Sequence, residues 1–305
     1  MRIAVVTPIT HLNGVLNLLS TKGEVYLLQE GTKSEVRELL LNKDIDTILC
    51  NPNQQTYKID KDLLEGTKVT LINTCSTGMN HIDVEYCKSV GIEIYSLTKD
   101  YELINNLPST SELAFGLLLD LMRNITSSNN VTKRDRSWDY LPFVGQQMKD
   151  FKVGIVGYGR LGRMMAKYCK AFDASVYIYD PYSDESNVNS LADLFKICDA
   201  VSLHVHVNDE TKYMIDYSLL CSNVKFLINT SRGEVVKEVD VIKALQEGKL
   251  WGYAADVVED EFGDISKSPF FYSQNLDLNY ILTPHVGGMT IQGQEKAYKW
   301  AINKL

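Results

Sequence analysis

The chain has 305 residues, of which 45% are hydrophobic and 23% charged, a composition typical of a globular protein long enough for two domains. Its formal net charge of −8 disfavours nucleic acid or an anionic membrane as the main partner, because both attract basic surfaces. The six scattered cysteines form no C-x-x-C pair, and no apolar stretch approaches the roughly 18 residues of a membrane span, so we expect a cytoplasmic protein with reduced thiols.

The first hundred residues alternate apolar strand segments with helical patterns such as Lys33–Asn42 and Ile82–Val90. Alternation of this kind predicts a parallel sheet covered by helices. No glycine-rich turn follows the first of these strands. The expected strands are Arg2–Thr7, Val25–Gln29, Thr47–Cys50, Val69–Asn73 and Glu93–Ser96.

A buried helix and then a loop are expected over residues 108–136. Residues 108–112 contain the serine, threonine and first-turn glutamate typical of a helix start with side-chain capping. The apolar run Leu113–Met122 has the length of a well-buried helix and is too short to span a membrane. The polar stretch Asn124–Arg136 is expected to be a loop or mobile surface.

A glycine-rich turn follows the strand Lys152–Val156 in the middle of the chain. Gly157 permits a tight turn, Gly159 allows a pyrophosphate to approach the backbone, and Gly162 lets the next helix pack close to the strand. The phosphates would lie at the N-terminus of the helix that continues over Arg163–Phe172, where free amides and the helix dipole favour anions. The pattern therefore predicts a dinucleotide site.

An acidic residue ends the next expected strand, Ser175–Tyr179. Asp180 lies 18 residues after Gly162, near the roughly 20-residue offset of a carboxylate that binds the adenosine ribose. The six residues after Asp180 include no arginine or lysine, so a 2′-phosphate would meet carboxylates. The sequence therefore predicts NAD in preference to NADP.

Strand and helix patterns continue to the end of the chain, and Gly248 is expected to stop one of the helices. The expected elements are helix Leu191–Cys198, strand Ala200–Val207, helical turn Tyr217–Cys221, strand Val224–Asn229, helix Lys237–Glu247, strands Trp251–Val257 and Tyr280–Thr283, and the closing helix Ile291–Leu305.

Three of the later strand ends carry polar side chains of different chemistry. Ligands bind outside the carboxyl ends of the strands in open parallel sheets. Reduction of a 2-oxo acid beside a nicotinamide needs a cation for the substrate carboxylate, and Arg232 offers a bidentate guanidinium. It also needs a proton donor for the carbonyl oxygen. His285 is the candidate, and Glu261 beside it would favour the imidazolium and orient the ring.

Each of these residues has a plainer interpretation on its own. Arg232 could be a solvated loop arginine, Glu261 part of a surface acidic run, and His285 a structural histidine. Their position at three strand ends beside a dinucleotide site favours the joint catalytic interpretation. The five histidines show no metal-ligand spacing with the cysteines, so no metal site is expected.

The motifs, taken in chain order, resemble those of the D-isomer-specific 2-hydroxyacid dehydrogenases over nearly the whole chain. They are Asn73–Asp83, Ser111–Ala114, Gly157-x-Gly159-x-x-Gly162, Asp180, Ser202-Leu-His204, Asn229–Gly233, Asp256 to Glu261 and Thr283–Gly288. The resemblance implies an α/β fold of two doubly wound parallel-sheet domains. A flavodoxin-like substrate domain would comprise residues 1–105 and 284–305, and an inserted Rossmann NAD-binding domain would comprise residues 106–283.

The resemblance also implies the reaction and the site. The protein would interconvert a small D-2-hydroxy acid and its 2-oxo acid with NAD, and would form a homodimer through the region of residues 111–122. Arg232 would hold the substrate, His285 would be the acid in reduction and the base in oxidation, and Glu261 would be its partner. The backbone of Ser76, Thr77 and Gly78 would bind the substrate carboxylate. The implied cofactor-binding residues are Arg160 and Leu161 along the pyrophosphate, Asp180 at the ribose, Thr110, Thr230 and Asp256 at the nicotinamide end, and Gly157, Gly159, Gly162, His206, Thr211 and Gly288.

The sequence departs from the family pattern in three places. His206 stands where proline is usual, and we interpret it as a wall residue under the adenosine. Val258 replaces a more usual aromatic residue near the acid. Phe262 stands where a proline commonly follows the glutamate, so Asp260 or Glu259 could serve in place of Glu261 if the loop shifts.

Several alternatives stay open on the sequence. A phosphoglycerate dehydrogenase is close in chemistry, although residues 51–55 offer no basic side chain for a phosphate and only Lys58 is near. Formate dehydrogenases share the architecture but pair their histidine with glutamine, which Glu261 disfavours. Some relatives are NAD(H)-sensing corepressors that bind peptides, and these can retain the arginine, glutamate and histidine. The acidic charge and the lack of long tails favour a metabolic enzyme.

Overall fold

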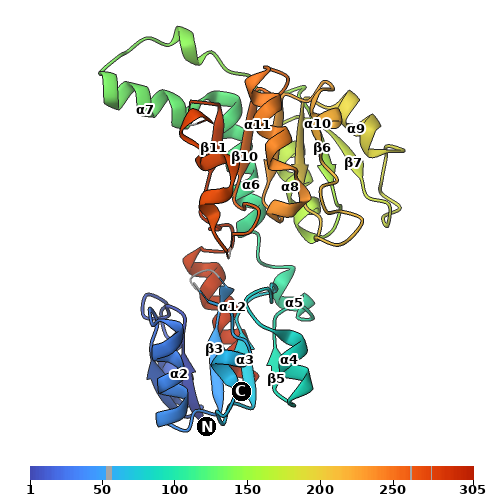
Figure 1. The fold of residues 1–305 in the computed structure, drawn as a ribbon. Coiled ribbons are helices and arrows are strands. Elements are labelled where there is room, and N and C mark those ends of the chain that lie inside the picture. The colour runs from blue at the N-terminus through green and yellow to red at the C-terminus, as the bar shows by residue number, and fades with distance from the viewer. Residues whose placement is uncertain (53–56, 262, 276) are drawn as a thin grey trace. The chain divides into compact units, whose positions relative to one another are not determined.

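The computed structural model describes residues 1–52, 57–261, 263–275 and 277–305, and is drawn as a ribbon in Figure 1. Contacts divide the chain into two compact units. The first unit comprises Met1–Leu107 and Gly288–Leu305, and the second unit comprises Pro108–Gly287. These divisions fall a few residues after the boundaries expected at 105 and 283. Both units are α/β structures with a parallel sheet, as predicted.

The first unit contains a five-stranded parallel sheet in the order β2-β1-β3-β4-β5, which is the flavodoxin-like order. Two separate apolar clusters, one on each face of the sheet, bury most of its Ile, Leu and Val side chains. The strands are β1 (Arg2–Val5), β2 (Glu24–Leu27), β3 (Thr47–Cys50), β4 (Leu71–Thr74) and β5 (Glu93–Tyr95). The helices are α1 (Val15–Ser20), α2 (Lys33–Asn42), α3 (Lys61–Leu64), α4 (Val84–Ser89), α5 (Tyr101–Ile104) and α12 (Ile291–Asn303).

The C-terminal helix α12 belongs to the core of the first unit although the second unit separates it in the sequence. The buried Tyr298 hydroxyl lies 2.9 Å from Thr7 Oγ1. Asn73 Nδ2 donates a 2.9 Å hydrogen bond to the carbonyl oxygen of Ala301, and both groups are buried. The second unit is therefore an insertion, and both ends of the chain build the first unit.

The second unit contains a six-stranded parallel sheet in the order β11-β10-β9-β8-β6-β7, so the chain changes direction along the sheet between β6 and β8. A ligand in such a sheet binds at the carboxyl edge near this switch point. The strands are β6 (Lys152–Val156), β7 (Ser175–Tyr179), β8 (Ala200–Leu203), β9 (Phe226–Asn229), β10 (Gly252–Ala255) and β11 (Tyr280–Leu282).

Helices cover both faces of this second sheet. One apolar cluster joins α6 (Ser109–Arg123) and α8 (Arg160–Ala171) to the strands, and the other joins α9 (Leu191–Ile197), α10 (Tyr217–Leu220) and α11 (Glu238–Gln246). Short 3₁₀ helices lie at Leu141–Phe143, Gly233–Val235, Ile265–Lys267, Pro269–Phe271 and Ser273–Asn275. None of the helices in the described ranges has the length and hydropathy needed to span a lipid bilayer.

Two expectations for the α6 region were wrong. Helix α6 begins with Pro108 at its N-cap and has no side-chain capping bond. The stretch expected to be a loop contains a helix, α7 (Ile125–Asp135). Asn124 adopts a left-handed conformation (φ 54°) that ends one helix and begins the next, and the Asp120 carboxylate accepts hydrogen bonds from the Thr126 amide and hydroxyl. Local capping thus forms a helix where apolar periodicity is weak.

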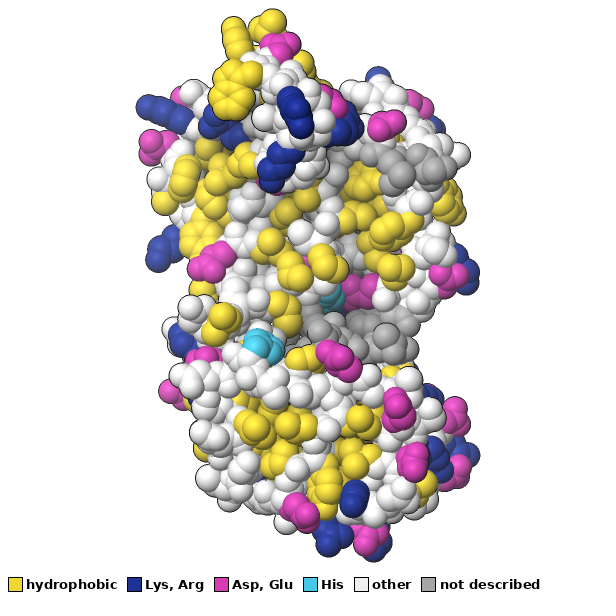
Figure 2. All heavy atoms as spheres, turned by 90° about the vertical axis from the view of Figure 1, so that its left-hand side faces the viewer, with side chains coloured by type: hydrophobic (Ala, Val, Ile, Leu, Met, Phe, Trp, Pro, Cys, Tyr) yellow, Lys and Arg dark blue, Asp and Glu magenta, His cyan; other side chains and the backbone are white. Residues whose placement is uncertain are grey.

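Residues 125–144, which we call the arm, expose unusually large apolar side chains. Helix α7 buries none of its residues, and the chain beyond it leaves Trp138 94% and Tyr140 74% exposed. Leu141 and Val144 are also exposed. Figure 2 shows hydrophobic side chains at the tip of this segment beside lysine and arginine side chains. A surface of this kind is typical of a protein contact.

Candidate active site

The glycine-rich turn after β6 has the packing that a dinucleotide needs. Gly157 has φ +86°, and a Cβ on it would lie 2.7 Å from the carbonyl oxygen of His204. A Cβ on Gly162 would lie 2.1 Å from the carbonyl oxygen of Gly157. A Cβ on Gly159, in contrast, would have nothing within 4 Å. Two glycines therefore permit the turn and the approach of α8, and the third leaves open space at the helix N-terminus.

Asp180 connects the end of β7 to this turn. One carboxylate oxygen accepts a 2.7 Å hydrogen bond from the Tyr158 amide, and the other accepts a 2.9 Å bond from the Tyr182 amide. Arg163 lies over the Tyr158 ring, 4.6 Å from its centroid, and pairs with Glu185. The carboxylate is thereby fixed beside the glycine-rich turn 157–162, which we call the dinucleotide fingerprint, as a ribose-binding acid requires.

Two buried polar atoms lie just after β8 and β9 without a hydrogen-bond partner among the described residues. They are Nδ1 of His204 and Oγ1 of Thr230. Burial lowers the pKa of His204 to about 4, so its imidazole is neutral at physiological pH. Buried polar atoms normally have partners, and the polar groups of a dinucleotide could supply them at this edge of the sheet. The residues present therefore fit NAD.

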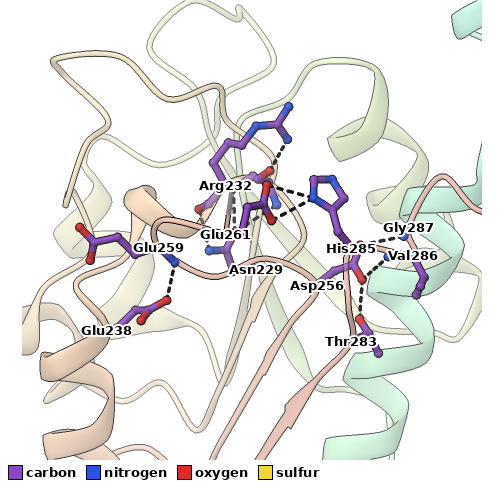
Figure 3. A network of polar contacts seen from close by, with 11 residues as sticks. Asn229, Arg232, Glu238, Asp256, Glu259, Glu261, Thr283, His285, Val286 and Gly287 are labelled. Atoms are coloured by element: carbon purple, nitrogen blue, oxygen red, sulfur yellow. Dashed lines mark hydrogen bonds and ion pairs between the residues drawn. The ribbon is translucent and has the colours of Figure 1, made fainter. Parts of the chain in front are cut away.

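His285 and Glu261 form the central contact of the site (Figure 3). His285 Nδ1 lies 3.0 and 2.9 Å from the two carboxylate oxygens of Glu261. The His285 side chain is 29% exposed and that of Glu261 15% exposed, so the pair is partly shielded from water. Of the three residues in the acidic run 259–261, Glu261 makes this contact. Asp260 turns the chain with φ +55°, and Phe262 lies outside the described residues.

The backbone of His285 has a positive φ of 53°, which is costly for a residue with a side chain. Asp256 braces this conformation, because its carboxylate accepts hydrogen bonds from the amides of Val286 (2.8 Å) and Gly287 (2.7 Å) and from the Thr283 hydroxyl. Burial is the main cause that raises the Asp256 pKa, and these hydrogen bonds oppose it. Asp256, for which a place at the nicotinamide end was expected, holds the loop that carries His285.

Arg232 follows β9 and lies near Glu261 and His285 (Figure 3). Its Nη1 donates a 2.7 Å hydrogen bond to the Ser231 carbonyl oxygen. Asn229 orders this turn, because its side chain donates to the Arg232 carbonyl oxygen at 2.9 Å and accepts from the Ser231 hydroxyl at 2.7 Å. A cation, a carboxylate and an imidazole thus meet within the second unit.

The turn after Arg232 packs directly on the acidic loop, which we define as residues 257–261. A Cβ on Gly233 would lie 2.1 Å from the carbonyl carbon of Val258 and 2.2 Å from the Glu259 nitrogen. Only glycine allows this approach of two backbones. Gly233 therefore sets the separation between Arg232 and Glu261.

Sequence reasoning missed Glu238, which anchors the same acidic loop. Glu238 is 3% exposed at the start of α11 and accepts hydrogen bonds from the Glu259 amide (2.7 Å) and the Ser268 hydroxyl (2.6 Å). Burial raises the pKa of its carboxyl. In the sequence it looks like an ordinary first-turn acid, and no local signal marks it as buried.

The other predicted residues lie in several places. In the first unit, the Ser76 hydroxyl donates to the Gly78 carbonyl oxygen at 2.7 Å, and the Thr77 carbonyl oxygen accepts from Thr98. In the second unit, Thr110 lies in α6, Arg160 and Leu161 begin α8, and the Leu161 carbonyl oxygen accepts from Ser111 at 3.0 Å. His206 is exposed and its carbonyl oxygen accepts from the Thr211 hydroxyl at 2.6 Å, whereas Gly288 begins the second segment of the first unit. Within the described residues no cluster of His, Cys, Asp or Glu side chains could hold a metal ion.

A dinucleotide-binding oxidoreductase is the class of protein that this sheet and its strand ends define. Models of the D-isomer specific 2-hydroxyacid dehydrogenases match nearly the whole chain, the NAD-binding domain over residues 115–287 and the catalytic domain over residues 3–102. The chain therefore belongs to this family of NAD-dependent enzymes. The resemblance seen in the motifs, the class of enzyme and the cofactor NAD are thereby confirmed.

Known relatives span several substrates. Glyoxylate reductase from Thermococcus litoralis is 33% identical over 88% of this chain and 82% of its own. D-3-phosphoglycerate dehydrogenase from Methanocaldococcus jannaschii is 30% identical over 92% of this chain, but the match spans only 53% of that protein. The crystal structure of D-lactate dehydrogenase from Aquifex aeolicus with NAD and lactic acid is 25% identical, with a TM-score of 0.76 over 100% of this chain and 94% of that one.

Proposed function

We propose that this protein reduces a small 2-oxo acid to the D-2-hydroxy acid with NADH, and runs the reverse oxidation with NAD. The observation that carries the proposal is the bidentate contact between His285 Nδ1 and Glu261 next to Arg232, on the same sheet edge as the dinucleotide fingerprint. A relative of similar length reduces glyoxylate, which supports a small substrate. The phosphoglycerate dehydrogenase alternative has less support from the sequence, because residues 51–55 carry no basic side chain for a phosphate. Residues 53–55 of this candidate loop lie outside the described residues.

The proposed chemistry assigns one task to each side chain. NADH, when bound, supplies the hydride that the substrate C2 carbon accepts. Arg232 holds the substrate carboxylate and carbonyl with its planar guanidinium. The His285 Nδ1–H donates a hydrogen bond to the Glu261 carboxylate and keeps its proton, so Nε2 is the nitrogen that gives a proton to the carbonyl oxygen in reduction and takes it back in oxidation. The Glu261 carboxylate stabilises the imidazolium and fixes the ring orientation.

The proposed binding residues belong to both units of the chain. The cofactor would be held by the fingerprint glycines and the start of α8, by Asp180 at the ribose, and by residues at later strand ends. The set is Thr110, Gly157, Gly159, Arg160, Leu161, Gly162, Asp180, His206, Thr211, Thr230, Asp256 and Gly288. The backbone of Ser76, Thr77 and Gly78 in the first unit would bind the substrate carboxylate, and the hydrogen bond from the Ser76 hydroxyl supports a fixed loop there.

A substrate panel tests the reaction. NADH oxidation would be followed with glyoxylate, hydroxypyruvate, pyruvate, phenylpyruvate and 3-phosphohydroxypyruvate. We expect turnover with at least one, and loss of about two to four orders of magnitude in Arg232→Ala and in His285→Ala with NADH affinity largely retained. The exposed Arg123 at the end of α6 offers the matched control, and Arg123→Ala should behave as wild type.

Two results would contradict the proposal. Retained activity in either active-site variant would remove the assigned role. Intact NADH binding without turnover on any acid would instead favour an NADH-sensing binding protein, the alternative that the sequence left open.

We also propose that the protein acts as a cytoplasmic homodimer in which the arm covers a second copy of the chain. The exposed Trp138, Tyr140, Leu141 and Val144 support the dimer, since several large apolar side chains exposed in one segment commonly mark a protein contact. All six cysteines are free thiols, and five of them are buried, which supports a reducing compartment.

A further inference from the structure

Glu238 is a buried acid that the proposed mechanism does not use. A carboxylate at 3% exposure loses most of its hydration, and this loss must be offset by hydrogen bonds. The offset comes from two donors outside its own helix, the Glu259 amide and the Ser268 hydroxyl. Burial raises the pKa of Glu238, and the nearby negative charge of Glu234 raises it further. The positions of these two donors indicate a structural role for Glu238.

This structural role concerns the acidic loop. Strand β10 ends at Ala255, and the Asp256 amide makes the last ladder bond, to the Asn229 carbonyl oxygen at 3.0 Å. Beyond it the loop is held by the backbone of Gly233, by the Tyr213 hydroxyl on the Glu259 carboxylate, and by Glu238 on the Glu259 amide. The Glu238 carboxylate accepts its hydrogen bond from a main-chain amide, that of Glu259, two residues before Glu261.

We propose that Glu238 is a positioning residue that holds Glu261 against His285 by binding the Glu259 amide. The proposal rests on the proposed function for its catalytic consequence. It makes α11 part of the active site through the acidic loop. A displacement of Glu261 by about 1 Å would be enough to cost activity, because proton transfer depends on a fixed geometry.

Kinetics of two substitutions test the role. We expect Glu238→Ala to lower kcat roughly ten- to a hundredfold while the KM for NADH stays near the wild-type value. Glu238→Gln should restore most of the rate, because its amide oxygen still accepts from Glu259 and its amide nitrogen can donate to the Ser268 hydroxyl. Glu247 at the exposed C-terminal end of α11 offers the matched control, and Glu247→Ala should leave kcat unchanged. An unchanged kcat in Glu238→Ala would overturn the proposal.

A double variant distinguishes positioning from general damage. If Glu238 acts through Glu261, then Glu238→Ala should cost nothing further in a Glu261→Ala background. A further loss of the same size in that background would show that Glu238 acts elsewhere, and would overturn the proposal. NADH affinity and the thermal midpoint, measured on each variant, identify any variant that fails to fold.

A spectroscopic test does not depend on turnover. With ¹⁵N-labelled histidine, the His285 Nδ1 resonance is assigned from its loss in His285→Gln, and it reports the hydrogen bond to Glu261. We expect Glu238→Ala to move this resonance towards its position in Glu261→Ala, and Glu238→Gln to leave it near wild type. No movement in Glu238→Ala would overturn the positioning role even if no 2-oxo acid is turned over. Movement without turnover on any acid would instead count against the proposed function alone.

Discussion

Gly233 lies in the turn after Arg232 and packs directly on the backbone of the acidic loop. Because the atoms in the way of a Cβ are backbone atoms of Val258 and Glu259, no side-chain rotation can make room. We predict that Gly233→Ala destabilises the protein by about 1–3 kcal/mol and lowers kcat at least tenfold, since overpacking would push Glu261 away from His285. Urea unfolding and turnover measure the two effects.

Gly116 gives the matched control for that substitution. It lies exposed in α6, and a Cβ there would have nothing within 4 Å. Gly116→Ala should stabilise the protein by about 0.5–1 kcal/mol, because alanine is the better helix former. Equal effects of the two substitutions would mean that the Gly233 contact is not needed.

His81 gives a prediction about pH. It is 2% exposed, its Nε2 lies 3.1 Å from Thr74 Oγ1, and burial lowers its pKa from 6.5 to about 4. Between these values the unfolded chain binds a proton that the folded chain does not, so stability is lost as the pH falls through this window. We predict that, when the pH falls from 7 to 5.5, the free energy of unfolding decreases by roughly 1 kcal/mol less in His81→Gln than in the wild type. Identical pH dependence of urea unfolding in the two proteins would contradict the prediction.

At the scale of single elements, the sequence predicted features with local causes. The fingerprint turn could be predicted because Gly157 and Gly162 answer local steric demands of one strand, turn and helix. Helix α7 was missed because it buries no residue, so its sequence has no apolar stripe to indicate a helix. Its first turn is bound by the carboxylate of Asp120, which lies in the preceding helix and accepts from Thr126.

Tertiary contacts explain what could not be predicted in the site. The helix α11 was expected from Lys237–Glu247, but one hydrogen bond of the buried Glu238 carboxylate comes from Ser268, thirty residues later in the chain. The contact of Glu261 with His285 was likewise open between three acidic residues. It depends on the path of the acidic loop, which Gly233 and Glu238 set and no local pattern records.

At the scale of the whole molecule, the arm predicts the oligomeric state. We expect a solution mass near twice the 34.5 kDa of one chain, and a shift to the single-chain mass in Trp138→Glu, because a charge there would be buried against the second copy. Tyr101, 66% exposed in the first unit and outside the arm, gives the control. Tyr101→Glu should keep the larger mass in light scattering. A wild-type mass of one chain would exclude the dimer.

The insertion of one unit into the other has a consequence for how such a protein can change over generations. His285, Glu261 and Arg232 all lie in Pro108–Gly287, together with the dinucleotide fingerprint. The loop proposed to read the substrate carboxylate, residues 76–78, lies in the other unit. If these proposed roles hold, substitutions in the flanking parts of the gene would alter substrate binding without changing the residues of hydride and proton transfer. A family with one reaction and many substrates is the expected product of that arrangement.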